Sequence, residues 1–160
     1  LQVSSLKDKL AFVSAPMATE AQLLRVHTEA YLKEFTSLSD SGGGELGLYA
    51  PFGAGSYEIA KLSAGLAIDA VDRVIDREYN NAYVMSRPPG HHCLPDASLG
   101  FCLLANISIA IEAAIDKHKL KRVVVLDWDA HHGHLPQTIF FERDDVVTIS
   151  LHHGNCFSPC

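Results

Sequence analysis

The stretch "RVVVLDWDAHH" (residues 122–132) passes from an apolar strand to polar chemistry with no turn residue between them. Its first half, from Val123 to Leu126, is a short β-branched run that is typical of a strand buried on both faces. Its second half places two carboxylates and two imidazoles within six residues, at Asp127, Asp129, His131 and His132. Because charged groups directly behind a buried strand need partners, this pattern predicts a functional site at the end of the strand.

The rest of the chain predicts a sheet around this strand. "AYVMS" (82–86) and "DVVTISL" (145–151) have the pattern of two further strands. The other segments predict helices over residues 103–119 and 136–142, and earlier helices that begin near Thr19, Thr28 and Ser56. Strands that alternate with helices indicate an α/β fold, here a three-layer, open, mostly parallel sheet with helices on both faces.

The polar residues that follow the three predicted strands point to one site. In a parallel sheet, ligands bind beyond the carboxyl ends of the strands. Ser86 leads to His91 and His92, Asp127 leads to Asp129 and His131, and Ser150 leads to His152. If the second of these segments stays extended, its alternating side chains project toward one side. Two carboxylates and an imidazole are a ligand set for zinc, and adjacent histidines can move a proton, which together predict metal-assisted hydrolysis of an amide.

Composition excludes several other classes of function. The 160 residues carry a net charge of −6 and 48% hydrophobic residues, which suits one globular domain or a part of one and argues against direct nucleic-acid binding. No apolar run is long enough to predict a membrane span. The four cysteines form no CxxC pair, so we interpret them as free thiols of a reducing compartment, the cytoplasm, or the nucleus in a eukaryote. Nothing in the sequence indicates an oligomeric state.

Three motifs resemble the histone deacetylase family, especially its class II-type members and the bacterial histone deacetylase-like amidohydrolases. In chain order they are "RPPGHHCLPDASLGFCLLANISIA" (87–110), "VVVLDWDAHHG" (123–133) and "VVTISLHHGNCFSP" (146–159). The resemblance covers nearly the whole chain, so residues 1–160 are expected to be part of a single deacetylase-like catalytic domain. It implies a zinc-dependent amidohydrolase that removes acetyl or other acyl groups from acetyl-lysine or similar acetylated amines, on a protein or on a small molecule.

The resemblance also implies roles for individual residues. Asp129 and His131 would bind the catalytic zinc. His91 and His92 would be the active-site pair, with His92 as general base and His91 as its electrostatic partner. Asp127 would orient His91.

Substrate and structural ions are the remaining roles that the resemblance implies. Phe101 would line the narrow channel for the acyl-amine side chain, and the carbonyl of Gly100 would contact the substrate amide. A structural potassium ion would be bound by Asp127, Ser150 and main-chain oxygens of Asp129, His131 and Leu151. A second potassium site would use main-chain oxygens near Phe140, Arg143 and Val146.

The chain departs from the family pattern in two ways. The family's third zinc ligand, an aspartate, and its transition-state tyrosine lie beyond residue 160, so we expect an internal fragment, incomplete at both ends and inactive by itself. The family usually carries Asn-Gly-Thr or Asp-Gly after the histidines, where this chain has His134, Leu135 and Pro136. The residue at 134 normally supports the second histidine, which leaves the tuning of His92 open.

Two alternative functions remain open at this point. The first is a catalytically inactive, deacetylase-like binding protein, which the departure at 134–136 favours. The second is an arginase- or agmatinase-like manganese hydrolase, which would want a further carboxylate where Gly133 stands. Loops at the rim of the channel decide the natural substrate, and the rim loop visible here is the glycine-rich segment 41–55.

Overall fold

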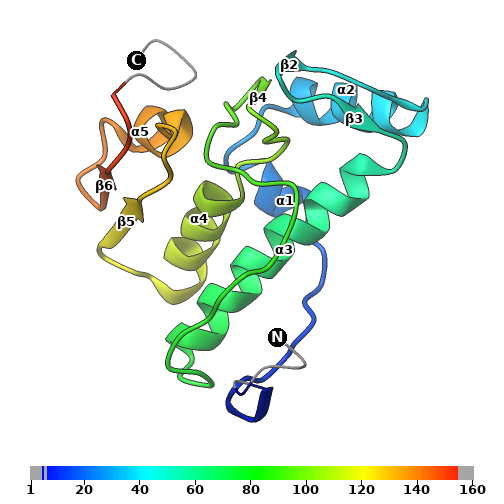
Figure 1. Cartoon of the computed structure of the whole chain (residues 1–160). Coiled ribbons are helices and arrows are strands. Elements are labelled where there is room, and N and C mark those ends of the chain that lie inside the picture. Colours follow the sequence, from blue (N-terminus) through cyan, green and yellow to red (C-terminus); the bar gives the residue numbers. More distant parts are fainter. Residues whose placement is uncertain (1–4, 6, 155–160) are drawn as a thin grey trace.

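The computed structural model describes residue 5 and residues 7–154 (Figure 1). The helices are the short 3-10 helix η1 (Lys7–Lys9), α1 (Glu20–Leu23), α2 (Glu29–Asp40), α3 (Ser56–Ile75), α4 (Asn106–His118) and α5 (His134–Phe140). The strands are β1 (Gly43–Gly44), β2 (Gly47–Leu48), β3 (Phe52–Gly53), β4 (Ser98–Leu99), β5 (Val123–Asp127) and β6 (Val146–Ser150). None of the helices in this part of the chain is long and apolar enough to cross a lipid bilayer.

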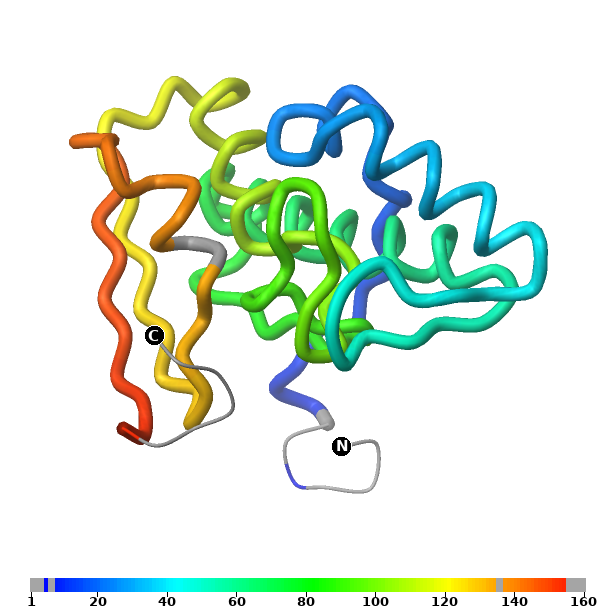
Figure 2. Tube along the Cα trace, turned by 90° about the horizontal axis from the view of Figure 1, so that it is seen from above, coloured from blue at the N-terminus to red at the C-terminus, as the bar shows by residue number. Residues whose placement is uncertain are grey.

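Strands β5 and β6 form the parallel pair that the sequence predicts. Their register runs from Val123 opposite Val146 to Asp127 opposite Ser150, so both strands end at the same edge. One face of the pair packs on α4 and α5 through a small apolar cluster that consists of Ile111, Val125, Phe140 and Val146. Seen from above, both helices lie on the inner side of the strands (Figure 2). The α/β class is therefore confirmed.

The three-layer prediction is met on one face of this pair only. The opposite face exposes Val124, Leu126, Val147 and Ile149, and residues 7–154 supply no helix that covers it. The described residues thus form two of the three expected layers: the strands β5 and β6, and the helices on one of their faces.

The predicted strand at 82–86 is wrong. These residues have no strand pairing in the structure, and Tyr83 and Met85 are 88% and 64% exposed. The side-chain pattern suits a strand, but a strand also needs a neighbour to accept and donate its backbone hydrogen bonds. Within residues 7–154, nothing pairs with this segment.

The larger core lies among α2, α3 and α4, and it supports the loops that carry the candidate site. Phe35 of α2 is fully buried and contacts the rings of Phe52 and Tyr57 edge-on, at centroid distances of 4.7 and 5.2 Å. Leu104 and Ile109 around the start of α4 are also fully buried. Burial of these large side chains is the main source of stability that the described residues offer.

The helix starts near Thr19 and Thr28 are confirmed, and the one at Ser56 differs from the prediction. Thr19 forms a reciprocal capping box with Gln22 of α1, and Thr28 Oγ1 accepts the Tyr31 N–H of α2. Ser56 is the first residue of α3, and it follows Gly55, which has a φ of 74° and carries no capping oxygen. The oxygen comes instead from the end of α2, where Ser39 Oγ accepts the Tyr57 N–H at 3.0 Å.

The buried His27 connects two segments that frame the candidate site. Its Nδ1 donates to the Pro95 carbonyl at 3.1 Å, and its Nε2 accepts the Ala105 N–H at 3.0 Å. Because one partner only accepts and the other only donates, the ring is neutral with its proton on Nδ1. Burial lowers the pKa of His27 to about 4, against the opposing effect of the Pro95 carbonyl. The residue is therefore a neutral brace between the loop after His92 and the start of α4.

We predict that acid weakens this brace. The pKa of His27 is lower in the folded protein than the usual 6.5, so its contribution is complete above pH 6.5 and is lost as the pH falls toward about 4. The loss amounts to about 3 kcal/mol of unfolding free energy. In the full-length protein, His27→Leu should cost about 1 to 2 kcal/mol at pH 7, because leucine can make neither bridging hydrogen bond, and should flatten this pH dependence. Urea unfolding at a series of pH values measures both effects; equal pH dependence in both proteins contradicts this account.

Candidate functional site

The loop that carries His91 and His92 is fixed against the start of α4. A Cβ atom on Gly90 would lie 2.6 Å from the Asn106 nitrogen, so this approach requires glycine. The Asn106 side-chain amide donates to the Pro88 carbonyl at 3.0 Å. The turn that carries both histidines is thereby packed directly against the start of α4.

The segment after β5 curls, and it does so through its own carboxylates. Asp127 Oδ1 accepts the Asp129 N–H at 3.0 Å, and Asp129 Oδ1 accepts the His131 N–H at 2.8 Å. Aspartate side chains that bond the backbone two residues further on stabilise turns. The assumption that 127–131 stays extended is therefore wrong. The expected meeting of Asp129 with His131 nevertheless occurs, by a different geometry.

Asp127 joins the curled segment to the histidine loop. Its Oδ2 accepts a hydrogen bond from His91 Nδ1 at 3.0 Å, and both side chains are largely buried. Because a carboxylate only accepts, His91 carries its proton on Nδ1. The ring of His91 lies 4.0 Å from the ring of His92, centroid to centroid. The structure thus brings together the three residues that the sequence groups as catalytic.

His92 is 4% exposed and lies among other imidazoles. Its ring centroid is 6.2 Å from that of His131, and its Nδ1 is 3.3 Å from His134 Nδ1. Burial, with the nearby His91 as the next cause, lowers the pKa of His92 to about 4. Near neutral pH the ring is uncharged and has a nitrogen that is able to accept a proton.

The same surroundings act on His134. Burial, followed by the neighbouring His132 and His91, lowers the pKa of His134. One of the two Nδ1 atoms in the His92–His134 pair donates to the other, so His134 fixes one side of the His92 ring. The sequence marks position 134 as unusual but does not show that its imidazole replaces the expected support with another hydrogen-bonding group.

Asp129 and His131 lie close enough to be two ligands of one metal ion. The Asp129 Oδ1 and His131 Nδ1 atoms are 3.1 Å apart, and both side chains are half exposed. In this structure the contact is a hydrogen bond in which His131 Nδ1 donates to the carboxylate. With the proton on Nε2 instead, both atoms could face one tetrahedral zinc ion, whose bonds of about 2.0 to 2.1 Å place two ligands about 3.3 Å apart. The His131 N–H holds the pKa of the Asp129 carboxyl below its usual value, which favours the charged form that binds cations. Within residues 7–154, no group of three or more potential ligands converges on a metal-binding geometry.

Gly100 and Phe101 form the tip of a tight turn next to His92. Leu99 and Cys102 close this turn with hydrogen bonds in both directions, and Phe101 is 67% exposed. The Cys102 sulfur accepts the His92 N–H at 3.4 Å. Phe101 and Gly100, to which the resemblance assigns substrate binding, therefore lie one and two residues before Cys102, which contacts His92.

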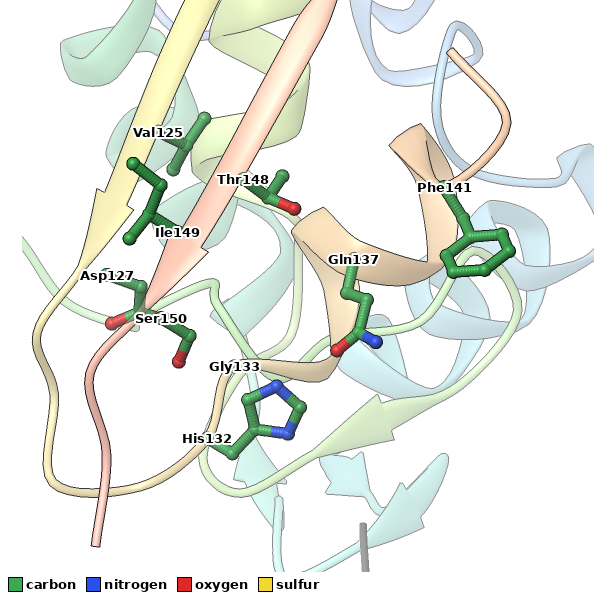
Figure 3. A pocket seen from close by; sticks show the side chains of 9 residues that line it. All are labelled: Val125, Asp127, His132, Gly133, Gln137, Phe141, Thr148, Ile149 and Ser150. Carbon is green, nitrogen blue, oxygen red and sulfur yellow. The ribbon is translucent and has the colours of Figure 1, made fainter. Parts of the chain in front are cut away.

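The residues proposed for the first potassium ion gather at the ends of β5 and β6. Asp127 lies opposite Ser150, and the Asp127 carbonyl accepts the Leu151 N–H at 2.8 Å. Figure 3 shows the side chains of Asp127 and Ser150 next to each other at the edge of a cavity of about 310 Å³. The other lining residues are Val125, His132, Gly133, Gln137, Phe141, Thr148 and Ile149.

Two further sets of predicted residues have definite places. For the second potassium ion, Phe140 and Arg143 lie in one turn, in which the Phe140 carbonyl accepts the Arg143 N–H at 3.0 Å, while Val146 begins β6. Of the cysteines, Cys93 and Cys102 are buried free thiols, as predicted. Cys156 and Cys160 lie outside the described residues.

Gly133 is a site residue that sequence analysis noted only for lacking a carboxylate. A Cβ atom at this position would lie 2.3 Å from Asp127 Oδ2 and 3.0 Å from His91 Nδ1. The hydrogen bond between those two atoms therefore exists because residue 133 has no side chain. In the sequence, the only signal of this role is that Gly133 directly follows the histidine pair 131–132.

Comparison with known proteins gives one consistent answer. The family model described as "Histone deacetylase domain" matches residues 1–159. The chain is 59% identical over 159 residues to a "Histone deacetylase-like amidohydrolase" of Pseudomonas aeruginosa, which covers 99% of this chain and 42% of that protein. It is 34% identical over 158 residues to "Polyamine deacetylase HDAC10" of Danio rerio, covering 95% of this chain and 23% of that protein.

A solved structure agrees with the sequence relatives. The crystal structure of the HDA15 HD domain superposes with a TM-score of 0.83 at 31% identity, over 88% of this chain and 39% of that one. The chain spans about two fifths of the length of the bacterial relative, and the matched part contains every site residue described above.

We predict that a methyl group at position 133 disrupts the site. In the full-length protein, Gly133→Ala should break the hydrogen bond from His91 Nδ1 to Asp127, because the new Cβ occupies its place. Gly53→Ala is the matched control, since a Cβ there meets nothing within 4 Å. Imidazole NMR reports the hydrogen-bonded Nδ1 proton of His91, which should be lost in the first variant and kept in the second. Its survival in Gly133→Ala contradicts the steric argument.

Proposed function

The chain belongs to the histone deacetylase family, and from that premise we propose that the protein is a zinc-dependent amidohydrolase that removes acetyl or other acyl groups from acetyl-lysine or similar acetylated amines. One arrangement of side chains at the candidate site supports this proposal. The Asp129 carboxylate and His131 Nδ1 lie 3.1 Å apart, and His131 lies beside the neutral His92, whose neighbour His91 is held by Asp127. Two potential metal ligands beside a proton acceptor suit metal-assisted hydrolysis of an amide.

Asp129 and His131 would hold the zinc ion as two of its protein ligands. A carboxylate and an imidazole are ordinary zinc ligands, and their separation in this structure fits one ion. When bound, zinc supplies a Lewis acid that makes water more acidic and a carbonyl more electrophilic. We expect a third protein ligand from outside the described residues, as the family resemblance implies.

His92 would act as the general base. Because its pKa is about 4, it is unprotonated near neutral pH and can take a proton from the attacking water. It would then return that proton to the leaving amine as the amide bond breaks. The contact with His134 Nδ1 keeps the His92 ring in one orientation during both transfers.

His91 would support this proton transfer through charge. Its Nδ1 proton is directed at Asp127, so its other nitrogen faces away from that carboxylate. Asp127 would thus keep the His91 ring oriented beside His92, with its proton on Nδ1. The same carboxylate, with Ser150 and nearby main-chain oxygens, would bind the structural potassium ion.

The arginase-like alternative is disfavoured by the steric role of Gly133. A carboxylate at this position would need a side chain, and its Cβ would lie where the hydrogen bond between Asp127 and His91 lies. The binding-protein alternative rests on His134. In this structure His134 still supplies a hydrogen-bonding nitrogen to His92, so the departure from the family pattern leaves His92 supported.

We predict that the full-length protein hydrolyses a fluorogenic acetyl-lysine substrate and loses this activity to a zinc chelator. His92→Ala and Asp129→Ala should each reduce kcat/KM by about 100-fold or more, since one removes the base and the other a metal ligand. The isolated 160 residues should show negligible turnover, because the described residues supply only two of the zinc ligands that we propose.

The matched control is His118→Ala, which removes a histidine that contacts Asp72 far from the site. It should keep wild-type activity. Full activity in Asp129→Ala contradicts the zinc proposal. An inactive full-length protein that binds zinc supports the binding-protein alternative.

A further inference from the structure

The two adjacent histidines of the site have different kinds of hydrogen-bond partner. His91 Nδ1 faces the Asp127 carboxylate at 3.0 Å, and a carboxylate only accepts, so the position of the His91 proton is fixed. His92 Nδ1 faces His134 Nδ1 at 3.3 Å. Because either nitrogen of a neutral imidazole can carry the proton, this second hydrogen bond can run in either direction.

The direction of this hydrogen bond decides whether His92 can act as a base. If His92 Nδ1 donates to His134, the other ring nitrogen of His92, Nε2, is bare and can take a proton from water. If His134 Nδ1 donates instead, the proton of the neutral His92 ring lies on Nε2, and neither of its nitrogens is left to accept another. The two tautomers share the same heavy-atom positions but have opposite consequences for catalysis.

The backbone on both sides of His134 is fixed. His134 is the first residue of α5 and follows Gly133, whose lack of a side chain allows the chain to pass beside Asp127 and His91. One turn into the helix, Thr138 Oγ1 donates to the His134 carbonyl at 2.8 Å. The His134 ring therefore reaches His92 from a well-defined starting point.

The second nitrogen of His134 indicates the direction of the hydrogen bond. His134 Nε2 is buried and has no hydrogen-bond partner among the described residues. Burial, with His132 and His91 as further causes, lowers the pKa of His134, so its ring carries one proton near neutral pH. In proteins, a buried N–H is left without an acceptor more rarely than a buried acceptor is left without a donor. The structure thus favours a bare Nε2, which places the His134 proton on Nδ1, facing His92.

We propose that His134 limits the activity of the site by donating its Nδ1 proton to His92, which holds His92 mainly in the tautomer that cannot act as a base. This inference rests on the proposed deacetylase function and adds a positioning residue to it. Turnover then proceeds through the minor tautomer, in which His134 carries its proton on the buried Nε2. The cost of leaving that N–H unpaired corresponds to a population difference of about tenfold.

An acceptor at position 134 of the full-length protein tests this proposal. The Nδ1 atom of histidine and the side-chain oxygens of asparagine and aspartate are all bonded to Cγ. His134→Asn and His134→Asp therefore exchange the atom that faces His92 with little change in its position. Both variants should accept the His92 Nδ1 proton and raise kcat on an acetyl-lysine peptide about tenfold, with little change in KM.

Two controls separate the acceptor from other effects of the substitution. His134→Leu places a methyl group at the same position and should give no gain in kcat, because a methyl group accepts no hydrogen bond. His118→Asn makes the same exchange at a histidine that contacts Asp72 far from the site, and it should leave kcat unchanged.

Imidazole NMR measures the tautomer of His92 directly and does not depend on turnover. Spectra that correlate the ring nitrogens with the carbon-bound ring protons distinguish a protonated nitrogen from a bare one, and His92→Ala assigns the signals. In the wild type the proton of His92 should lie mainly on Nε2, and in His134→Asn it should lie on Nδ1.

Three results overturn the role of His134. They are a wild-type His92 that carries its proton mainly on Nδ1, an unchanged kcat in both acceptor variants of an active enzyme, and a gain in His134→Leu equal to that in His134→Asn. The absence of hydrolysis in the wild type and in every variant refutes the proposed deacetylase function instead, while the NMR spectra still decide the tautomer of His92.

Discussion

The Asp127 carboxylate is the group on which the arrangement of the site depends. Its two oxygens have different partners: Oδ2 accepts the His91 Nδ1 proton, and Oδ1 accepts the Asp129 N–H. One bond fixes the loop that follows residue 86, and the other bends the chain that leaves β5. The carboxylate can serve both only because Gly133 has no side chain. A single buried group thus links two segments that are more than thirty residues apart.

Burial and charge then divide the site into two halves. His92 lies inside, where desolvation keeps it neutral, whereas Asp129 lies half exposed and is stabilised as an anion by the His131 N–H. A neutral base and an anionic ligand side by side are complementary requirements of metal-assisted hydrolysis. The His27 brace adds no charge to the site, because its ring is neutral. It joins the loop after His92 to the start of α4 through its two hydrogen bonds.

The parts of the structure that could be predicted are those that local sequence determines. The caps at Thr19 and Thr28 involve residues three positions apart, and the run from Val123 to Leu126 carries its own strand signal. Failures occurred where a distant residue decides: 82–86 has no strand to pair with, and the cap of α3 comes from Ser39 on another helix. A single sequence contains no information on such partners.

The site shows the same division between local and distant information. The spacing of Asp129 and His131 predicted that they meet, although by an extended strand and not by the turns that the two aspartates form. The roles of Gly133 and His134 depend on atoms of the loop at 91–92, which spacing does not reveal. Chemistry-bearing residue types were therefore visible in the sequence, while the small and supporting residues that position them were not.

The position of the bound metal tests the central claim most directly. A crystal structure of the full-length protein with zinc, with anomalous scattering recorded at the zinc edge, locates the ion without reference to activity. We predict a peak about 2.0 to 2.2 Å from an oxygen of Asp129 and from a ring nitrogen of His131, on the side that faces His92. A fully occupied zinc ion that contacts neither Asp129 nor His131 would contradict it.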